Sequence, residues 1–280
     1  MRDLGASGLL LGPVFESATH GYDTLDHMHI DVRLGGDAAF DQLVAACRDM
    51  GLQVMLDGVF NHVSRNHPAV QAALDETAGR LNPADNPWHG LVRAHVGDNG
   101  EPALDVFEGH GDLVALDHSA DETVDYVAHV MSHWLDRGAA GWRLDAAYAV
   151  PSPFWARVLP QVKAAHPYSW IFGEVIHGDY PRIIEESTMD SITQYELWKS
   201  IQHALETENF FELDWNLKRH NAFLDSFVPQ TFIGNHDVTR IASQIGPAKA
   251  ALALAVLMTV GGVPSIYYGD EQGYVGCLLY

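Results

Sequence analysis

Four acidic side chains stand at the ends of short apolar runs, three of them directly and the fourth after an Asn-His pair, and this repetition is the main chemical signal in the chain. They are Asp57, Asp145, Glu174 and Asp237. Carboxylates gathered in one place can supply a proton donor, a nucleophile and an electrostatic stabiliser. Arg143 stands two residues before Asp145, and alternate strand residues face the same side, so its guanidinium can hold that carboxylate ionised and aimed. Asp57 is interpreted as a buried structural carboxylate.

The apolar runs themselves are typical of buried parallel strands, because helix-like segments separate them. The runs cover 52–56, 140–144, 169–173 and 230–234. Parallel strands joined by right-handed helical crossovers place their carboxyl ends on one side, and a closed barrel brings these ends to one mouth. The four acidic groups are therefore expected to share one pocket.

Strand candidates occur at seven places, whereas a (β/α)8 barrel needs eight. Residues 1–6 resemble the end of a helix that leads into the first candidate, so we expect that one strand and most of its helix are missing. The sequence 275–280 also ends without the helix that should cover the last strand. The predicted fold is α/β, a (β/α)8 TIM barrel lacking the first strand. The candidates centre on Leu9, Val54, Trp142, Ile171, Ile192, Phe232 and Ile266.

Between Val63 and about Leu116 the regular periodicity gives way to Pro, Asn, Gly, His and Asp. Such a long irregular connection predicts a functional excursion or a small inserted domain. We therefore predict that 1–62 begins the barrel, 63–116 is an insertion after the third strand, and 117–280 completes the barrel. Helical spacing predicts helices over 38–50, 121–135, 153–166, 197–206, 217–224 and 248–259.

Composition limits the possible partners. The formal net charge is -21 over 280 residues, which argues against binding to nucleic acid or an anionic membrane and leaves neutral polar ligands open. Cys47 and Cys277 are far apart and indicate no disulfide framework. The first residues show no signal peptide, so a cytoplasmic location is expected. The apolar stretch 248–260 is too short to span a bilayer. The oligomeric state stays open.

Carboxylates arranged in this way suit the cleavage of a glycosidic bond. That reaction needs a proton donor for the leaving oxygen and a carboxylate on the other face of the sugar, about 5 to 5.5 Å away if it attacks directly. Asp145, beside Arg143, suits the nucleophile, and Glu174, at the end of an aromatic-rich strand, suits the proton donor. Further contacts to sugar hydroxyls or to a ring face are expected from Asp237, His62, His236 and Tyr22.

Each of these features alone has a simpler explanation. An Arg-x-Asp pair on a strand is commonly a structural ion pair. His62 and His236 each follow an asparagine and suit loop caps, or metal ligands in a chain with 16 histidines. Tyr22 suits loop packing. Their joint occurrence, in this order at successive strand ends, favours a catalytic site.

Taken together, these segments resemble the α-amylase family of glycoside hydrolases. Four segments match the conserved segments of that family in the same order, and two flanking segments match as well, so the resemblance spans nearly the whole chain. The four are 57–62, 141–145, 172–175 and 232–237, and the flanking segments are 20–22 and 262–269.

The resemblance implies a short B domain after the third strand and a retaining mechanism on α-glucosidic bonds of malto-oligosaccharides or α-glucans, through a covalent glucosyl-enzyme intermediate. By position, Asp145 matches the nucleophile, Glu174 the acid/base and Asp237 the transition-state stabiliser. The short B domain is similar to that of maltodextrin- or cyclomaltodextrin-degrading members. The residues that match contacts of the first glucose are Tyr22, His62, Arg143 and His236.

The chain departs from many family members just after the predicted nucleophile. Tyr148 and Ala149 stand where those enzymes carry Lys-His, a pair that contacts an acceptor-side sugar and offers a carbonyl to calcium. Asn61 matches a calcium ligand of some members. Calcium therefore stays open as a ligand, and no metal-ligand set is predicted.

Other functions stay open beside the leading hypothesis of a retaining α-glucan hydrolase with a glucan or oligosaccharide as its partner. A transglycosylase or isomerising glucosyltransferase would use the same intermediate. An inactive barrel fragment, or a barrel that binds sugar without catalysis, is an alternative of another class. A metal-dependent hydrolase is a further alternative, although the histidines show no paired metal-ligand spacing at strand ends.

Overall fold

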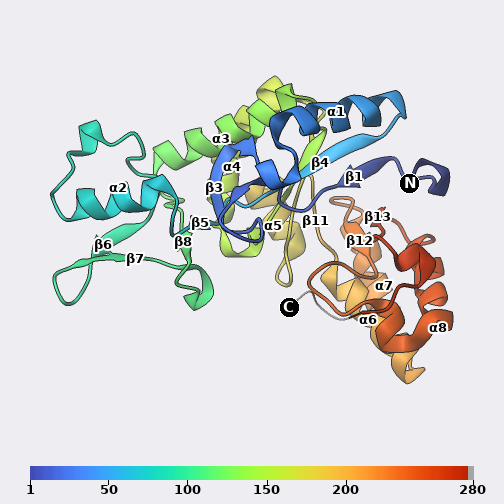
Figure 1. Ribbon diagram of the computed structural model, residues 1–280. Helices are drawn as coiled ribbons and strands as arrows, with labels where there is room; N and C mark the ends of the chain where they lie inside the picture. Colours follow the sequence, from blue (N-terminus) through green and yellow to red (C-terminus); the bar gives the residue numbers. More distant parts are fainter. Residues whose placement is uncertain (277–280) are drawn as a thin grey trace. The chain divides into compact units, whose positions relative to one another are not determined.

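The computed structural model describes residues 1–276, which fall into two compact units (Figure 1). The first unit is Met1–Ile171 and the second is Phe172–Tyr280. In the described part of the chain, every helix is too short or too polar to cross a bilayer. Cys47 is buried with a free thiol, and Cys277 lies outside the described residues.

Parallel strands form the central sheet of the first unit. β4 (Gln53–Gly58) pairs with β1 (Gly8–Leu10) on one side and with β9 (Gly141–Leu144) on the other. Leu56 and Trp142 face each other across β4 and β9, and both side chains are fully buried. Neighbouring strands thus follow the order of the chain, as barrel strands do.

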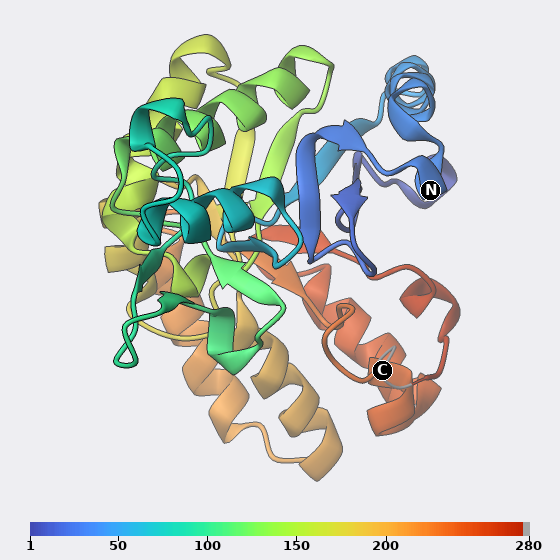
Figure 2. The same cartoon turned by 60° about the vertical axis from the view of Figure 1, so that its left-hand side comes forward.

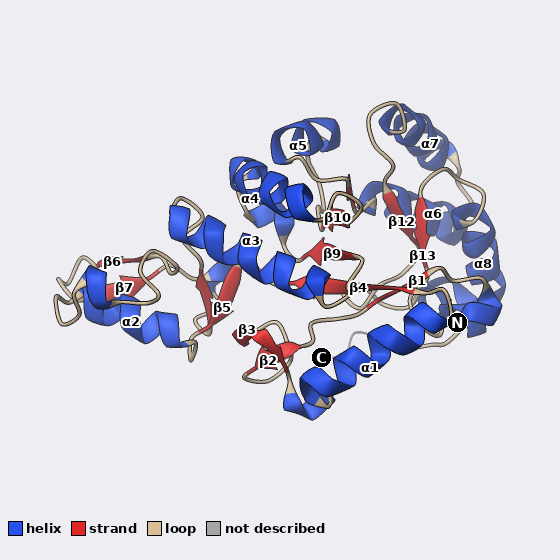
Figure 3. Cartoon of the chain, turned by 90° about the horizontal axis from the view of Figure 1, so that it is seen from above, coloured by secondary structure: helices blue, strands red, loops and turns tan. Residues whose placement is uncertain are grey.

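Long helices pack beside this sheet because their apolar side chains recur at helical spacing. These helices are α1 (Gly36–Asp49), α3 (Asp121–Asp136) and α4 (Ser152–Ala165). In α3 the buried positions include Val127 and Trp134, and α3 lies beside α4 (Figure 3). The helices predicted over 38–50, 121–135 and 153–166 are confirmed.

An antiparallel hairpin that the sequence pattern does not predict precedes α1. It consists of β2 (Phe15–Ser17) and β3 (Thr24–Ile30). The polar residues of β3 obscure the strand pattern in the sequence. His27 is nevertheless fully buried, with its Nδ1 3.0 Å from Tyr126 Oη and its Nε2 2.9 Å from the Val59 carbonyl oxygen. A buried histidine with both nitrogens paired fits a strand as well as an apolar residue does.

The segment after β4 has regular structure of its own. β5 (His62–Ser64) pairs with β8 (Leu113–Ala115), and α2 (Pro68–Thr77) lies beside the hairpin of β6 (Ala94–Val96) and β7 (Pro102–Leu104) (Figures 1 and 2). The domain boundaries at 62 and 116 stay a prediction. The buried apolar cluster of this segment comprises Val63, Ala69, Val70, Ala73, Leu91, Val92, Val114 and Leu116.

The second unit repeats the parallel, sequential arrangement. β10 (Trp170–Gly173) crosses the boundary between the units and pairs with β11 (Ser191–Ile192). A parallel bridge just after β11 leads to β12 (Gln230–Phe232), which pairs in parallel with β13 (Val263–Ser265). With β1, β4 and β9, these strands confirm all seven strand candidates.

Three helices of the second unit form a second apolar core. They are α6 (Tyr195–Thr207), α7 (Phe211–Phe223) and α8 (Ile241–Leu257), and α6 contacts both α7 and α8 (Figure 2). Helix α5 (Tyr180–Ser187) lies beside β11. A kink at Gly246, before Pro247, divides α8, and it explains why the sequence predicts only the second part. The short 3-10 helices of the described chain are Arg2–Leu4 (η1), Val32–Leu34 (η2), Pro83–Asp85 (η3), Phe107–Gly109 (η4), Ala147–Ala149 (η5) and Asp270–Gln272 (η6).

Candidate active site

Arg143 connects the carboxylates at the ends of β4 and β9. Its Nη1 donates to both carboxylate oxygens of Asp57, at 2.6 and 2.8 Å, and to Asp145 Oδ1 at 3.0 Å. The three side chains are at most 10% exposed, so water screens their charges weakly. The guanidinium therefore favours the ionised form of both carboxylates. The predicted contact between Arg143 and Asp145 is present, and Asp57 shares it.

The parallel register of β4 and β9 produces this cluster. Asp57 stands directly opposite Arg143, and the Asp145 amide donates to the Gly58 carbonyl at 3.0 Å. A side chain at Gly141 would place its Cβ against the backbone carbonyl oxygen of Trp170. Only glycine therefore allows β9 to begin where Arg143 and Asp145 reach Asp57.

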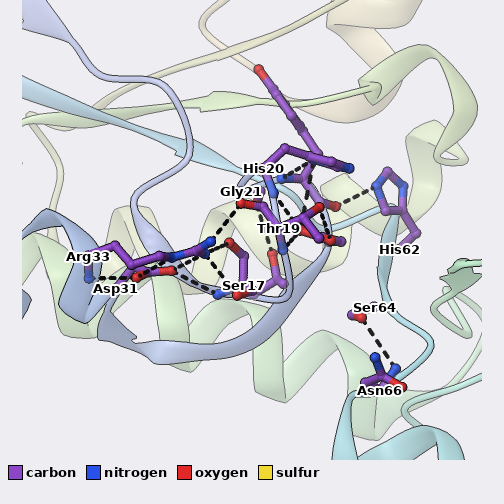
Figure 4. A network of polar contacts seen from close by, with 12 residues as sticks. Ser17, Thr19, His20, Gly21, Asp31, Arg33, His62, Ser64 and Asn66 are labelled. Carbon is purple, nitrogen blue, oxygen red and sulfur yellow. Dashed lines mark hydrogen bonds and ion pairs between the residues drawn. The ribbon is translucent and has the colours of Figure 1, made fainter.

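An ion pair fixes the loop between β2 and β3. Arg33 donates to the Asp31 carboxylate, to the Ser17 carbonyl and hydroxyl, and to the Thr19 carbonyl (Figure 4). Hydrogen bonds from Arg33 hold the pKa of the Asp31 carboxyl well below its usual range, although burial opposes them. Asp31 therefore stays ionised around neutral pH, and its ion pair with Arg33 continues to fix the loop.

Tyr22 extends from this loop toward the Arg143 cluster. Its hydroxyl lies 3.5 Å from Asp57 Oδ2. The preceding Gly21 has a φ of 98°, and a Cβ there would lie 2.9 Å from the Pro13 side chain. A residue with a side chain would be strained and crowded at this position. Tyr22 is half-buried, and its role as a stacking platform for a sugar stays a prediction.

His62 joins the insertion to the Tyr22 loop. Its Nε2 donates to the Tyr22 carbonyl at 3.0 Å, and its Nδ1 accepts from Asn61 Nδ2 at 3.1 Å. The Phe107 ring stacks on the imidazole with a centroid distance of 4.9 Å. Burial lowers the pKa of His62 to about 4, because the hydrogen bond to the Tyr22 carbonyl offsets it only in part. His62 is therefore neutral at pH 7, and the preceding asparagine sets its tautomer.

In the second unit, Glu174 directly follows β10, and two hydrogen bonds with uncharged donors lead to it. The Tyr195 hydroxyl donates to Glu174 Oε1 at 3.2 Å, and Asn235 Nδ2 donates to that hydroxyl at 2.8 Å. Glu174 and Tyr195 are both buried. Sequence reasoning missed Tyr195 as a site residue, although it is the last residue of the strand candidate 191–195 and the strand-end rule would have found it.

Asp237 and His236 lie in the turn after β12. The Asp237 amide donates to Asn235 Oδ1 at 2.9 Å, and His236 Nε2 lies 3.4 Å from Asp237 Oδ1. Their side chains are 43% and 34% exposed, far more than those of the Arg143 cluster. Asn235 thus holds both this turn and the Tyr195 hydroxyl.

The structure brings together the predicted residues within each unit. Tyr22, His62, Arg143 and Asp145 share one network in the first unit. In the second unit, Asn235 connects the Asp237 turn to Glu174 through Tyr195. Sequence reasoning missed Phe107, Tyr195 and the share of Asp57 in the cluster.

The match of Asn61 to a calcium ligand stays a prediction. Across residues 1–276, His, Cys, Asp and Glu side chains nowhere gather in threes or more in a way that would hold a metal ion. The Asn61 side-chain nitrogen Nδ2 lies 3.1 Å from His62 Nδ1, and the Asn61 backbone carbonyl accepts from the Leu116 amide at 3.1 Å.

Comparison with known proteins defines the class of this fold and site. The family model for the catalytic domain of alpha-amylase matches residues 1–279. The chain therefore belongs to the alpha-amylase family, and its fold is the (β/α)8 barrel of that family's catalytic domain.

Individual relatives show which members of the family the chain is similar to. The chain is 30% identical to a maltogenic alpha-amylase of Bacillus acidopullulyticus over 99% of its own length and 48% of the relative's. It is 30% identical to a cyclomaltodextrinase of Thermoanaerobacter pseudethanolicus over 99% and 49%. The structure of a cyclic alpha-maltosyl-(1→6)-maltose hydrolase from Arthrobacter globiformis matches with a TM-score of 0.86 and 27% identity, over 99% of this chain and 64% of that one. The chain spans about half the length of the curated relatives it matches.

Proposed function

We propose that the protein is a retaining glycoside hydrolase that cleaves α-glucosidic bonds in malto-oligosaccharides or α-glucans. The observation that carries the proposal is the buried Arg143 cluster, which favours an ionised Asp145 at the end of β9. The names of the relatives, a maltogenic alpha-amylase and a cyclomaltodextrinase, support the class of substrate. An acidic protein of net charge -21 also suits a neutral polyol better than an anion.

In the first step, Glu174 donates its proton to the glycosidic oxygen while the Asp145 carboxylate attacks the anomeric carbon. The bond between that carbon and the glycosidic oxygen breaks, and the leaving sugar departs as an alcohol. A glucosyl ester of Asp145 remains, and Glu174 becomes a carboxylate.

In the second step, the Glu174 carboxylate takes a proton from water, and the water oxygen attacks the anomeric carbon. The ester bond breaks, which restores the Asp145 carboxylate and the protonated Glu174. Two inversions give net retention of configuration. Asp237 holds ring hydroxyls as positive charge develops on the sugar, and the first glucose lies against Tyr22, His62, Arg143 and His236.

Replacement of the nucleophile tests the proposal directly. Asp145→Asn in the full chain should lower malto-oligosaccharide cleavage by about 10⁴-fold, because an amide neither attacks nor leaves as a carboxylate does. Asp136→Asn is the matched control, since that side chain is 75% exposed at the end of α3. Proton NMR of fresh product should show the α-anomer first. Undiminished turnover by Asp145→Asn, or initial β-anomer, would refute the assignment.

Transfer of the glucosyl group to a second sugar is a further candidate activity. The observation that favours it is Tyr148-Ala149 in place of the Lys-His pair, because this changes the surface just after the nucleophile. Incubation with maltotriose separates the two activities, because transfer gives longer or rearranged oligosaccharides and hydrolysis gives only shorter ones.

A further inference from the structure

A buried ion pair joins the segments that follow β12 and β13. Arg240, at the start of α8, donates from Nη1 to Asp270 Oδ1 at 3.0 Å and to the Tyr268 carbonyl at 2.8 Å. Asp270 is the first residue of η6, the short helix after β13. The Arg240 and Asp270 side chains are 11% and 1% exposed, so water screens their attraction only weakly. The ion pair therefore connects the ends of two strands that pair in parallel.

Aromatic rings surround the Arg240 guanidinium on its other sides. Its central carbon lies 4.4 Å from the centroid of the Tyr267 ring, 4.9 Å from that of Tyr268 and 5.9 Å from that of Tyr274. Ring faces attract a cation at these distances, and a planar guanidinium suits both a ring face and a carboxylate better than an ammonium group does. The rings and the carboxylate together therefore fix the position of this guanidinium.

The same ion pair closes the turn that carries Asp237. This turn begins at Gly234, where an added Cβ would lie 2.7 Å from Asp270 Oδ2, so the carboxylate packs on the first backbone atoms of the turn. The turn ends at Arg240, which holds that carboxylate from the other side. The Asp237 side chain lies between these two points and is 43% exposed. Its position therefore depends strongly on the backbone of the turn.

The energetics of the pair favour a role beyond stability. Asp270 Oδ2 is buried, yet it has no hydrogen-bond partner among the described residues. Burial raises the pKa of the Asp270 carboxyl, and the hydrogen bond from Arg240 opposes this effect. A well-packed apolar pair is often as stable as a buried ion pair, or more stable. A charged pair at this place is therefore better explained by the geometry it imposes.

We propose that Arg240 and Asp270 are positioning residues for Asp237: their ion pair holds both ends of its turn and thereby places the Asp237 carboxylate where positive charge develops on the sugar. The inference rests on the proposed function, in which Asp237 stabilises the transition state, and it adds the residues that hold Asp237 in place. Arg240 and Asp270 do not touch the sugar and act only through Asp237.

A change at Arg240 should affect catalysis only while Asp237 can respond to it. Arg240→Lys keeps the charge but loses the planar guanidinium. It should lower kcat for maltotriose by about tenfold, with a smaller change in KM, because a slightly misplaced catalytic group loses transition-state stabilisation. In an Asp237→Asn background the same substitution should lower the residual kcat by less than about twofold, since residues that act as a unit are not additive. An equal loss in both backgrounds would show a structural role and overturn the inference, as would no loss in either.

Arg219→Lys is the matched control in the same unit. The Arg219 guanidinium also pairs with a carboxylate, that of Glu196 at 2.8 Å, and lies 4.9 Å from the centroid of the Phe223 ring. This variant should lower the melting temperature and leave maltotriose cleavage unchanged. If it slows cleavage as much as Arg240→Lys does, the loss reflects general destabilisation and the inference is wrong.

A second variant disturbs the ion pair from the beginning of the turn. Gly234→Ala adds a methyl group against Asp270 Oδ2, so it should displace that carboxylate and lower kcat in the same direction as Arg240→Lys. Gly111→Ala is its control, because a Cβ there meets no atom within 4 Å. A kcat that Gly234→Ala leaves unchanged would contradict the inference.

Failure of the proposed function has a different signature. It would appear as an unaltered protein that releases no sugar from maltotriose. Crystal structures of the full chain with and without Arg240→Lys test the positioning role without turnover. A displaced Asp237 carboxylate in the variant supports the inference, and an unchanged one overturns it.

Discussion

Two strand-end carboxylates, one in each unit, have different partners. Asp145 after β9 shares the Arg143 guanidinium with Asp57, whereas Glu174 after β10 accepts a hydrogen bond from the neutral Tyr195 hydroxyl. An ion pair is favourable only while the carboxylate is charged. A hydroxyl donor suits a carboxylate and also the carbonyl oxygen of a protonated carboxyl.

In the proposed mechanism, these neighbours suit the two strand-end carboxylates to different roles. A nucleophile needs a stable negative charge, and the Arg143 guanidinium stabilises the negative charge of Asp145. An acid that later acts as a base must pass through both protonation states, and the contact with Tyr195 can persist in both. We therefore expect the same backbone position to serve the two proposed roles, because Arg143 contacts one carboxylate and Tyr195 the other.

The largest expected effect is on the cleavage rate. It distinguishes Glu174 from Asp145, because only the proposed proton donor becomes less important when the leaving group needs no proton. Glu174→Gln should lower maltotriose cleavage by about 10² to 10⁴-fold, the usual contribution of a general acid. The loss should be much smaller with α-glucosyl fluoride, because fluoride departs without a proton. Asp145→Asn should lose activity on both substrates. Fluoride release and sugar analysis measure these rates, and equal losses for Glu174→Gln on both substrates would contradict the assignment.

The next effect concerns stability and tests the charged cluster. Arg143→Met leaves two buried carboxylates without their cation, which should lower the free energy of unfolding by about 3 to 5 kcal/mol. Arg157→Met is the control, because its ion pair with Asp121 is exposed and should contribute less than about 1 kcal/mol. Urea unfolding measures both. Similar midpoints for the two variants would show that the cluster is not the electrostatic centre of the first unit.

Much of the fold follows from the sequence because its strands are apolar runs and most of its long helices carry apolar residues at helical spacing. The period-two rule also places Arg143 beside Asp145. The hairpin strand Thr24–Ile30 escapes prediction because a buried, hydrogen-bonded His27 stands where an apolar residue is expected. Helix α2 escapes it because Pro, Asn and Gly around it mask a short apolar face.

The candidate site is predictable only in part. Strand-end position identifies the three carboxylates, but which side chain contacts them depends on the register between strands. Asp57 faces Arg143 because of the β4 and β9 register, which no local pattern encodes. Phe107 and His62 lie 45 residues apart in sequence, and their stacking depends on how the insertion folds back. Such contacts require the tertiary structure.

A smaller effect concerns buried histidines of the first unit. Burial lowers the pKa of His27 to about 4, below the ordinary value of 6.5. Between these values the folded chain binds fewer protons than the unfolded chain, so stability is present above pH 6.5 and falls as the pH drops toward 4. This histidine contributes roughly 3 kcal/mol at most over that window. His62 and His67 change in the same direction.

His27→Gln should flatten the pH dependence of urea unfolding between pH 6.5 and 4, even if it lowers stability at pH 7. His166→Gln is the control for the loss of an imidazole, because that side chain is partly exposed near Asp136. A slope that His27→Gln does not reduce would mean that other groups control the acid sensitivity of the protein.

The smallest effect tests the neutral contact of the second unit. Tyr195→Phe removes the hydroxyl between Asn235 and Glu174. It should lower the free energy of unfolding by about 1 kcal/mol and raise the activation barrier of the catalytic step by about the same amount. The expected result is a kcat reduced by roughly fivefold with an unchanged KM, because the hydroxyl orients the acid and does not hold the sugar.

Tyr180→Phe supplies the matched comparison in the same unit. Tyr180 is fully buried, and its hydroxyl donates to the Ile176 carbonyl at 3.2 Å, so this variant also loses one buried hydrogen bond. Both variants should melt at similarly lower temperatures, but only Tyr195→Phe should slow maltotriose cleavage. If both slow it equally, the Tyr195 hydroxyl only supports the fold, and the contrast between a charged and a neutral carboxylate partner has no catalytic meaning.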